Sequence, residues 1–204
     1  MTVPSTSALA PRVLLAAFAL AAAACGSSGS ASDGPSPPPE PTCADYCATI
    51  QAACTTNIQQ YSNADDCLAS CKAFPVGAGG DVAGDTLGCR LTFARMAAAS
   101  APMAAAHCTH AGPGGDGVCG DNCTGYCDIA MMYCTDANSA KLYDTRAACM
   151  ADCATRLTDM KLDTGDGPRT DMGNQVACLL YHAQMGAVAP VGHCLGDLAG
   201  ATCK

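Results

Sequence analysis

Residues 42–72 read TCADYCATIQAACTTNIQQYSNADDCLASCK, and residues 122–154 read NCTGYCDIAMMYCTDANSAKLYDTRAACMADCA. Each stretch contains a C-x3-C pair, a third cysteine further on, and a second C-x3-C pair near its end. Residues four apart lie one above the other on one face of an α-helix. Each stretch therefore predicts two helices that carry cysteines on one face, with the third cysteine on the face of the first helix.

Two antiparallel C-x3-C helices can be joined by two disulfides, because both pairs have the same spacing along the helix axis. In residues 42–72 this predicts the bonds Cys43–Cys71 and Cys47–Cys67. A bond within one C-x3-C pair is disfavoured, since those two side chains do not lie at disulfide distance. The layout resembles the twin C-x3-C hairpins of plant α-hairpinins and small mitochondrial import chaperones, which implies a shared geometry.

The two stretches belong to a longer repeat of eight cysteines, in which only the loop lengths differ. Further positions carry the same residue in both copies: Tyr46 and Tyr126, Leu91 and Leu180, Ala94 and Ala183, Met96 and Met185, and His107 and His193. Such a repeat indicates a duplicated structural unit. We predict an eight-cysteine helical module at residues 42–119 and a second one at 120–204.

The chain has 17 cysteines among 204 residues, and 16 of them belong to the repeat. We predict that these sixteen form disulfides: Cys43, Cys47, Cys54, Cys67, Cys71, Cys89, Cys108, Cys119, Cys123, Cys127, Cys134, Cys149, Cys153, Cys178, Cys194 and Cys203. There is no Trp and there are only three Phe, so cross-links would compensate for a small core. Outside the C-x3-C pairs, four cysteines per module can pair in three ways, and spacing does not decide among them.

A third helix is predicted in each module, opened by Asp85 in the first and by Asn174 in the second, and interrupted by Pro102 and Pro190. No segment alternates β-branched residues as a strand would. The predicted fold class is all-α, with two tandem disulfide-stapled helical modules after a signal peptide and a flexible tether.

Residues 1–24 are predicted to be a lipoprotein signal peptide. The apolar run VLLAAFALAAAA follows Arg12 and is too short to span a bilayer, but it has the length of a signal-peptide core. Three alanines precede Cys25, which resembles the lipobox of bacterial lipoproteins and implies that this cysteine is lipidated. The lipobox prefers Leu at the position of Ala22, so ordinary cleavage in the same small-residue stretch is the alternative.

Lipidation explains why Cys25 is left over when the other cysteines are paired. The resemblance implies an exported protein held to the membrane through its N-terminal lipid, at the outer membrane or cell surface in a Gram-negative bacterium, because Gly26 is not the aspartate associated with inner-membrane retention. Residues 25–41 consist largely of Gly, Ser and Pro and are predicted to be a flexible tether.

The segments CRLTFARM (89–96) and HCTHAGPGGDGVCG (107–120) complete a pattern that resembles cysteine-rich lipoproteins of myxobacterial genomes. This resemblance implies no particular activity. The formal net charge of −8 disfavours nucleic acid as a partner. The sequence lacks C-x2-C, G-x-S-x-G, P-loop, dinucleotide-binding and H-E-x-x-H motifs, so we predict no catalytic residue, no metal site and no cofactor.

Two features could still carry chemistry. His107-Cys108 and His193-Cys194 repeat a histidine beside a cysteine, which could bind a metal or lower a thiol pKa. Because neighbouring helix residues point in different directions and both cysteines belong to the paired set, we interpret these histidines as structural. The loop LDTGDGPRTD offers Asp163, Asp166 and Asp171 to calcium, but it lacks the EF-hand spacing and is predicted to be an acidic turn.

The leading hypothesis is a non-enzymatic, lipid-anchored envelope or surface protein, that is, a disulfide-stabilised scaffold or binding module whose protein or envelope ligand is unknown. The alternative is a thiol-rich protein that binds or stores copper or another soft metal, since C-x3-C helices also line bacterial copper-storage bundles. Cu(I) requires reduced thiolates, whereas the export signal favours disulfides. A third hypothesis is an enzyme that uses a pair of aspartates, but the spacing of the aspartates along the sequence does not support it.

Overall fold

The computed structural model describes residues 38–156, 176–200 and 202–203. The α-helices are α1 (Cys43–Ala53), α2 (Ala64–Cys71), α3 (Leu87–Ala99), α4 (Ala104–Ala111), α5 (Asn122–Tyr133), α6 (Arg146–Arg156) and α7 (Val176–Met185). Short helical turns are η1 (Thr56–Ile58), η2 (Ala101–Met103), η3 (Gly115–Gly117) and η4 (Asp136–Asn138), and η6 (Val191–Leu198) is a π-helix. The described residues contain no strand, which confirms the all-α fold class.

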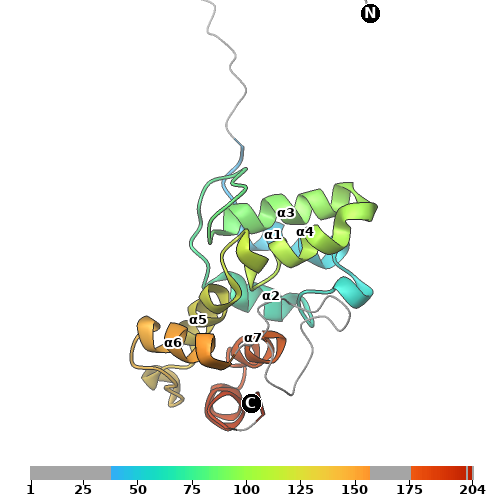
Figure 1. Cartoon of the computed structure of the whole chain (residues 1–204). Helices are drawn as coiled ribbons and strands as arrows, with labels where there is room; N and C mark the ends of the chain where they lie inside the picture. Colours follow the sequence, from blue (N-terminus) through green and yellow to red (C-terminus); the bar gives the residue numbers. More distant parts are fainter. Residues whose placement is uncertain (1–37, 157–175, 201, 204) are drawn as a thin grey trace, which may run out of the picture. The chain divides into compact units, whose positions relative to one another are not determined.

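Residues Pro37–Lys204 form one compact unit. Figure 1 shows α1, α3 and α4 side by side, and α1 and α4 both contact α3. Further along the chain, α5 packs against both α6 and α7. None of the helices in the described ranges is both long and apolar enough to cross a membrane.

Side-chain caps fix where the hairpin helices begin. Asn63 caps α2 by accepting a hydrogen bond from the backbone N–H of Asp66 at 2.9 Å. Thr145 accepts one from the N–H of Ala148 at 3.1 Å, at the start of α6. Such a cap satisfies a donor that the first helical turn leaves without a partner.

The prediction that Asp85 opens the third helix was wrong. The N-cap of α3 is Thr86, whose hydroxyl accepts a hydrogen bond from the N–H of Cys89 at 3.1 Å. The carboxylate of Asp85 instead pairs with Arg90 at 2.7 Å. A buried guanidinium requires an anionic partner, and this requirement takes Asp85 away from the capping position. Asn174, its predicted counterpart, lies outside the described residues.

The third cysteine of each stretch also differs from its predicted place on a helix face. Cys54 is the C-cap residue of α1 and Cys134 is the C-cap residue of α5. Each follows the last helical residue, where the backbone leaves the helical path. These cysteines can therefore turn toward partners far along the chain.

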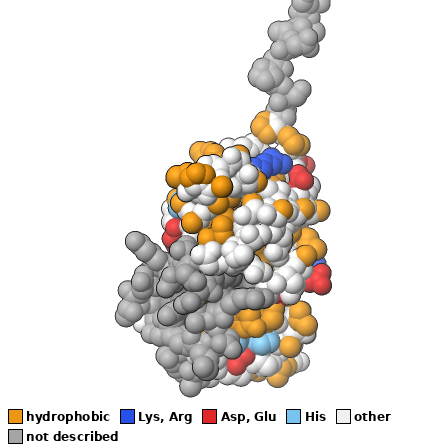
Figure 2. Space-filling model, turned by 90° about the vertical axis from the view of Figure 1, so that its right-hand side faces the viewer, with side chains coloured by type: hydrophobic (Ala, Val, Ile, Leu, Met, Phe, Trp, Pro, Cys, Tyr) orange, Lys and Arg blue, Asp and Glu red, His pale blue; other side chains and the backbone are white. Residues whose placement is uncertain are grey.

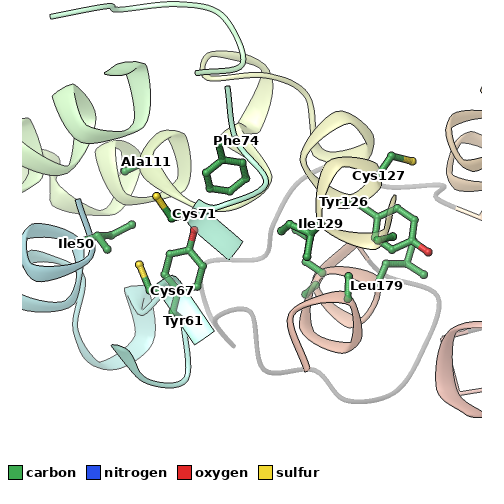
Figure 3. Packing of buried hydrophobic residues seen from close by; sticks show 14 of the residues in the cluster. Ile50, Tyr61, Cys67, Cys71, Phe74, Ala111, Tyr126, Cys127, Ile129 and Leu179 are labelled. Atoms are coloured by element: carbon green, nitrogen blue, oxygen red, sulfur yellow. The ribbon is translucent and has the colours of Figure 1, made fainter. Parts of the chain in front are cut away.

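Each half of the compact unit contains a tyrosine pair, and Figure 3 shows one buried member of each, Tyr61 and Tyr126. The rings of Tyr46 and Tyr61 meet edge to face at 6.2 Å between centroids and 89°, and those of Tyr126 and Tyr143 do so at 6.4 Å and 89°. The hydroxyl oxygens lie 2.8 Å apart in the first pair and 3.0 Å apart in the second. Edge-to-face contact is a favoured geometry for aromatic rings, so the same packing recurs in both copies.

Arg90 is fully buried, although arginine is rarely found inside a protein. Its guanidinium pairs with Asp85 and lies 3.9 Å from the centroid of the Phe74 ring. Its Nε and Nη2 atoms donate to the carbonyl oxygens of Gly112 and Pro113, both at 3.3 Å. Arg90 therefore links α3 to the connection between α4 and α5. At the equivalent position of the second copy, next to Cys178, stands Leu179.

Contacts also join the two halves of the chain. The Tyr133 hydroxyl in α5 donates to the carbonyl oxygen of Ala69 in α2 at 2.7 Å. The carbonyl oxygen of Pro113 approaches Gly125 so closely that any Cβ there would clash with it. Glycine therefore allows α5 to lie against the preceding connection. The division into modules at residues 119 and 120 stays a prediction.

Replacing Arg90 by leucine, the residue of the second copy, should lower the free energy of unfolding of the oxidised protein by about 3 kcal/mol, because it leaves the Asp85 carboxylate without its cation. Urea unfolding measures this change. The matched control is Arg95→Leu in the same helix, where the partner Asp45 and the arginine are both largely exposed. That change should cost at most about 1 kcal/mol. Equal losses in the two variants would contradict the role of Arg90.

Candidate functional site

The structure pairs all sixteen cysteines of the repeat. The bonds are Cys43–Cys71, Cys47–Cys67, Cys54–Cys108, Cys89–Cys119, Cys123–Cys153, Cys127–Cys149, Cys134–Cys194 and Cys178–Cys203. The joined Cα atoms are 5.5–5.8 Å apart, within the range that disulfides require.

The two copies have the same connectivity. In each, the first cysteine pairs with the fifth, the second with the fourth, the third with the seventh and the sixth with the eighth. The bonds Cys43–Cys71 and Cys47–Cys67 are those that the helical spacing predicted. For the other four cysteines of each copy, the structure has one of the three pairings that the spacing left open.

The bonds of each copy act at two ranges along the chain. The two hairpin bonds close short loops and hold the C-x3-C helices together. The third bond reaches much further, with a separation of 54 residues for Cys54–Cys108 and of 60 residues for Cys134–Cys194. It fixes the end of the first helix to a helix near the end of the copy. The framework therefore spans each copy rather than only its hairpin.

The histidines of α4 pack against an aromatic ring. His107 and His110 contact Phe93 of α3, with ring centroids 5.7 Å and 5.2 Å apart. Burial lowers the pKa of His110; Asp116 acts against this shift, at 3.5 Å from His110 Nδ1, whereas His107 lowers the pKa further. In this copy both histidines therefore pack against an aromatic ring, and His110 also lies near a carboxylate.

The second copy gathers polar groups at the equivalent place. His182 of α7 faces His193 and Asp197 of η6, and the two Nδ1 atoms are 3.0 Å apart. The Oδ2 atom of Asp197 is 3.0 Å from Nδ1 of His182 and 2.8 Å from Nδ1 of His193. We call these three residues the His–His–Asp cluster. Their donor atoms lie close enough together to hold a metal ion.

The local backbone explains why His193 and Asp197 share a face. Pro190 is the N-cap residue of η6, and the N–H of Ala199 reaches back five residues to the carbonyl oxygen of Cys194 at 3.1 Å. Hydrogen bonds of this span define the π-helix, which is rare and often marks a functional site. The second oxygen of Asp197, Oδ1, accepts a hydrogen bond from the Thr202 hydroxyl at 3.3 Å.

The sequence interpretation missed this cluster. It assigned His193 a structural role beside Cys194 and singled out neither His182 nor Asp197. The signal was present in the repeat: counted from the equivalent cysteines, His182 stands where the first copy has Phe93, and Asp197 stands where it has Ala111. A polar residue in one copy at a position that the other copy fills with an apolar residue could have identified the cluster.

Other predicted features lie outside the described residues. They are the signal peptide, the lipidation residue Cys25, most of the tether, and the loop with Asp163, Asp166 and Asp171. Their roles stay predictions.

A shallow hollow of about 430 Å³ is present near the ends of α1 and α3. Its lining is apolar and consists mainly of alanine: Ala52, Ala53, Ile58, Ala97, Ala98, Ala101 and Ala104. Figure 2 shows hydrophobic side chains gathered in the upper part of the view. The exposed Met103, in η2 beside this lining, adds to the apolar surface.

Two carboxylates lie close together between the halves of the chain. The pKa of Asp128 is raised to about 6, mainly by burial and then by a hydrogen bond with Asp85, whereas Arg146 opposes the shift. The Nη2 atom of Arg146 lies 2.7 Å from the Oδ1 atom of Asp128. A proton on Asp128 would relieve its repulsion with Asp85 and allow it to donate a hydrogen bond to that carboxylate.

Residues 39–124 match the family model described as the BfoA family C-terminal domain. The match covers α1 to α4 and the first turn of α5, and with them the first eight-cysteine copy. The chain is therefore similar to this family over less than half of its length. No curated protein and no solved structure matches the chain.

We expect Asp128 to contribute stability at low pH that is lost as the pH rises between about 4 and 7. A group whose pKa is raised by folding stabilises the folded state below its unfolded pKa, and this contribution is lost as pH rises through the folded value of about 6. Asp128→Asn retains a hydrogen-bond donor toward Asp85 and should show a smaller loss over this range. Urea unfolding at each pH measures the two profiles, and parallel profiles would contradict this account.

Removing one long-range bond with the double variant Cys54→Ala/Cys108→Ala should lower the free energy of unfolding by about 2–5 kcal/mol, because the unfolded chain regains the freedom of a long loop. The equivalent change, Cys134→Ala/Cys194→Ala, should have a similar effect if the two copies share their framework. Urea unfolding of the oxidised proteins measures both losses. A loss below about 1 kcal/mol in either variant would contradict a stabilising role for that bond.

Proposed function

We propose that this protein is a non-enzymatic, exported and lipid-anchored envelope or surface protein, in which disulfide-stapled helical modules act as a scaffold or binding module. The observation that carries the proposal is the identical four-bond connectivity in both copies. Retention of the full set of bonds, while surface and loop residues differ, is typical of a framework that presents variable surfaces.

The disulfides support a location outside the cytosol. Sixteen cysteines joined in eight bonds require an oxidising compartment, since cytosolic reductants keep most thiols reduced. All the repeat cysteines except the partly buried Cys43 are also buried; Cys67, Cys89, Cys127 and Cys178, for example, are inaccessible to solvent. Their sulfur atoms therefore replace part of the apolar core that a chain without Trp lacks.

The lipid anchor is supported by the cysteine count. The sixteen repeat cysteines pair with one another, which leaves Cys25 outside the disulfide framework. A cysteine after a signal-peptide core and three alanines is the residue that a lipobox would modify. Several acyl chains on one residue give stable attachment to a membrane. The tether would then separate the folded part from the lipid surface.

The soft-metal alternative loses its support from the cysteines. Storage of Cu(I) needs thiolate ligands, and all sixteen candidate sulfur atoms are in disulfides. The proposal that the protein is not an enzyme rests on the lack of catalytic motifs in the sequence.

The alanine-lined hollow is the surface that we propose for binding the ligand. Its lining is apolar, and its small side chains leave the hollow open.

The anchor is tested by exporting the full chain from a Gram-negative host and measuring its intact mass and membrane fraction. We expect an acylated N-terminal Cys25, recovery with the outer membrane, and release of the Cys25→Ala variant into the soluble envelope fraction. The control Gly26→Asp should keep the lipid but move the protein toward the inner membrane. An unmodified N-terminus, or a Cys25→Ala variant that stays with the membrane, would overturn the anchor.

The binding role is tested separately with the purified, oxidised full chain and defined envelope components, namely peptidoglycan, lipopolysaccharide and phospholipid vesicles. We expect saturable binding to one of these components, weakened by Ala101→Arg in the alanine-lined hollow. The control is Ala137→Arg in η4, away from the hollow. Binding that the two variants affect equally would contradict a role for the hollow. Turnover of a component by the wild-type protein would contradict the non-enzymatic function.

A further inference from the structure

We propose that His182, His193 and Asp197 form a binding site for one divalent transition-metal cation of the zinc class. This site is independent of the scaffold function, because it needs neither the lipid anchor nor an envelope ligand. It belongs to the second copy alone.

The spacing of the donor atoms fits a single cation. The Nδ1 atoms of His182 and His193 and the Oδ2 atom of Asp197 form a triangle with sides of 3.0, 3.0 and 2.8 Å. Zinc binds nitrogen and carboxylate oxygen at about 2.0–2.1 Å, and two tetrahedral ligands at that distance are about 3.3–3.4 Å apart. Each side of the triangle therefore has to lengthen by only about 0.3–0.6 Å for one cation to contact all three atoms.

Without a metal ion, each placement of protons on the two imidazoles leaves one of the three contacts unfavourable. If both Nδ1 atoms carry a proton and donate to Asp197, the two N–H groups lie side by side at 3.0 Å. If one imidazole accepts from the other, its lone pair also faces a carboxylate oxygen within 3.0 Å. A cation in the centre removes this conflict, because all three atoms then present lone pairs to one positive charge.

The chemistry of the donors selects the class of cation. Two imidazoles and one carboxylate suit zinc and the neighbouring first-row divalent metals, whereas calcium and magnesium prefer sites made of oxygen. The sulfur atoms of Cys178 and Cys203 lie near His182, but they are bonded to each other. Soft thiolate ligation is therefore not available to this site in the oxidised protein.

The disulfide framework holds the donors in place. His193 adjoins Cys194, which is bonded to Cys134 at the end of α5. His182 lies one helical turn after Cys178, which is bonded to Cys203. The Thr202 hydroxyl holds the other oxygen of Asp197, a contact that orients a ligating carboxylate. The donors therefore come from two elements that are each tied down by a separate bond.

The first copy provides an internal comparison. It has Phe93, His107 and Ala111 at the three equivalent positions, and there the aromatic ring packs against the histidine. Ala111 is fully buried, so its counterpart Asp197 places a carboxylate where packing alone requires only a methyl group. The two replacements together supply the donors that a lone histidine lacks.

A cation can also reach the cluster. The side chain of His182 is only 5% exposed, whereas those of His193 and Asp197 are 27% and 29% exposed. One donor is therefore anchored in the interior, and the other two lie at the surface. Water or a further ligand can complete the coordination from that side.

The test is titration of the exported, fully oxidised full chain with Zn²⁺ by calorimetry and with Co²⁺ by visible absorption. We expect one ion per chain and a Co²⁺ spectrum typical of nitrogen and oxygen ligands without thiolate. His182→Phe, which introduces the residue of the first copy, and Asp197→Asn should each weaken the affinity for the metal by about 100-fold or more. Loss of a residue that only supports a ligand typically weakens metal affinity by about 10–100-fold, so a larger loss is expected when a ligand itself is removed.

The matched control is His107→Gln, at the position in the first copy that is equivalent to His193. It should leave the affinity for Zn²⁺ unchanged. Intact mass shows that each variant keeps its eight disulfides, so that loss of binding is not mistaken for misfolding. Because Asp197→Asn conserves shape, it remains informative if His182→Phe fails to fold.

Three results would overturn the proposal. The first is no saturable binding of either ion by the oxidised chain. The second is binding that Asp197→Asn leaves unchanged, which would place the metal elsewhere. The third is binding that develops only after reduction, which would make the thiolates the ligands. Failure of the lipid anchor test affects none of these outcomes, because titration uses the purified protein.

Discussion

The structure depends on the pairing of two antiparallel C-x3-C helices by two parallel disulfides. Equal spacing on both helices permits both bonds at once, and the bonds Cys43–Cys71 and Cys47–Cys67 set the register of α1 against α2. The third and fourth bonds then attach the remaining helices to this hairpin. With few large apolar side chains available, the covalent framework, more than a hydrophobic core, restricts the chain to one arrangement.

A shared framework allows the two copies to differ in their interiors. The first copy buries Arg90 where the second has Leu179, and it packs Phe93 where the second has His182. Changes of this kind would destabilise an ordinary small domain, because each replaces an apolar group by a polar or charged group or the reverse. Here the bonds around these positions are the same in both copies. Within this constant framework, the second copy has the His–His–Asp cluster where the first has Phe93, His107 and Ala111.

Spacing along the chain predicted the features that depend on local geometry: the all-helical fold, the repeat and the hairpin bonds. It did not predict that Thr86 rather than Asp85 caps α3, because the buried guanidinium of Arg90 claims the Asp85 carboxylate only in three dimensions. The His–His–Asp cluster was missed for a related reason. Its donors come from two segments whose contact depends on the long-range bonds, and spacing left the pairing of those cysteines open.

The central claim is that both copies have the same four bonds and that no bond joins one copy to the other. Mass spectrometry of peptides from the unreduced, natively exported protein tests it directly. The account predicts eight bonds, with first-to-fifth, second-to-fourth, third-to-seventh and sixth-to-eighth pairing in residues 42–119 and again in 120–204. A bond between the copies, a different pairing in one copy, or free thiols among the sixteen cysteines would contradict it.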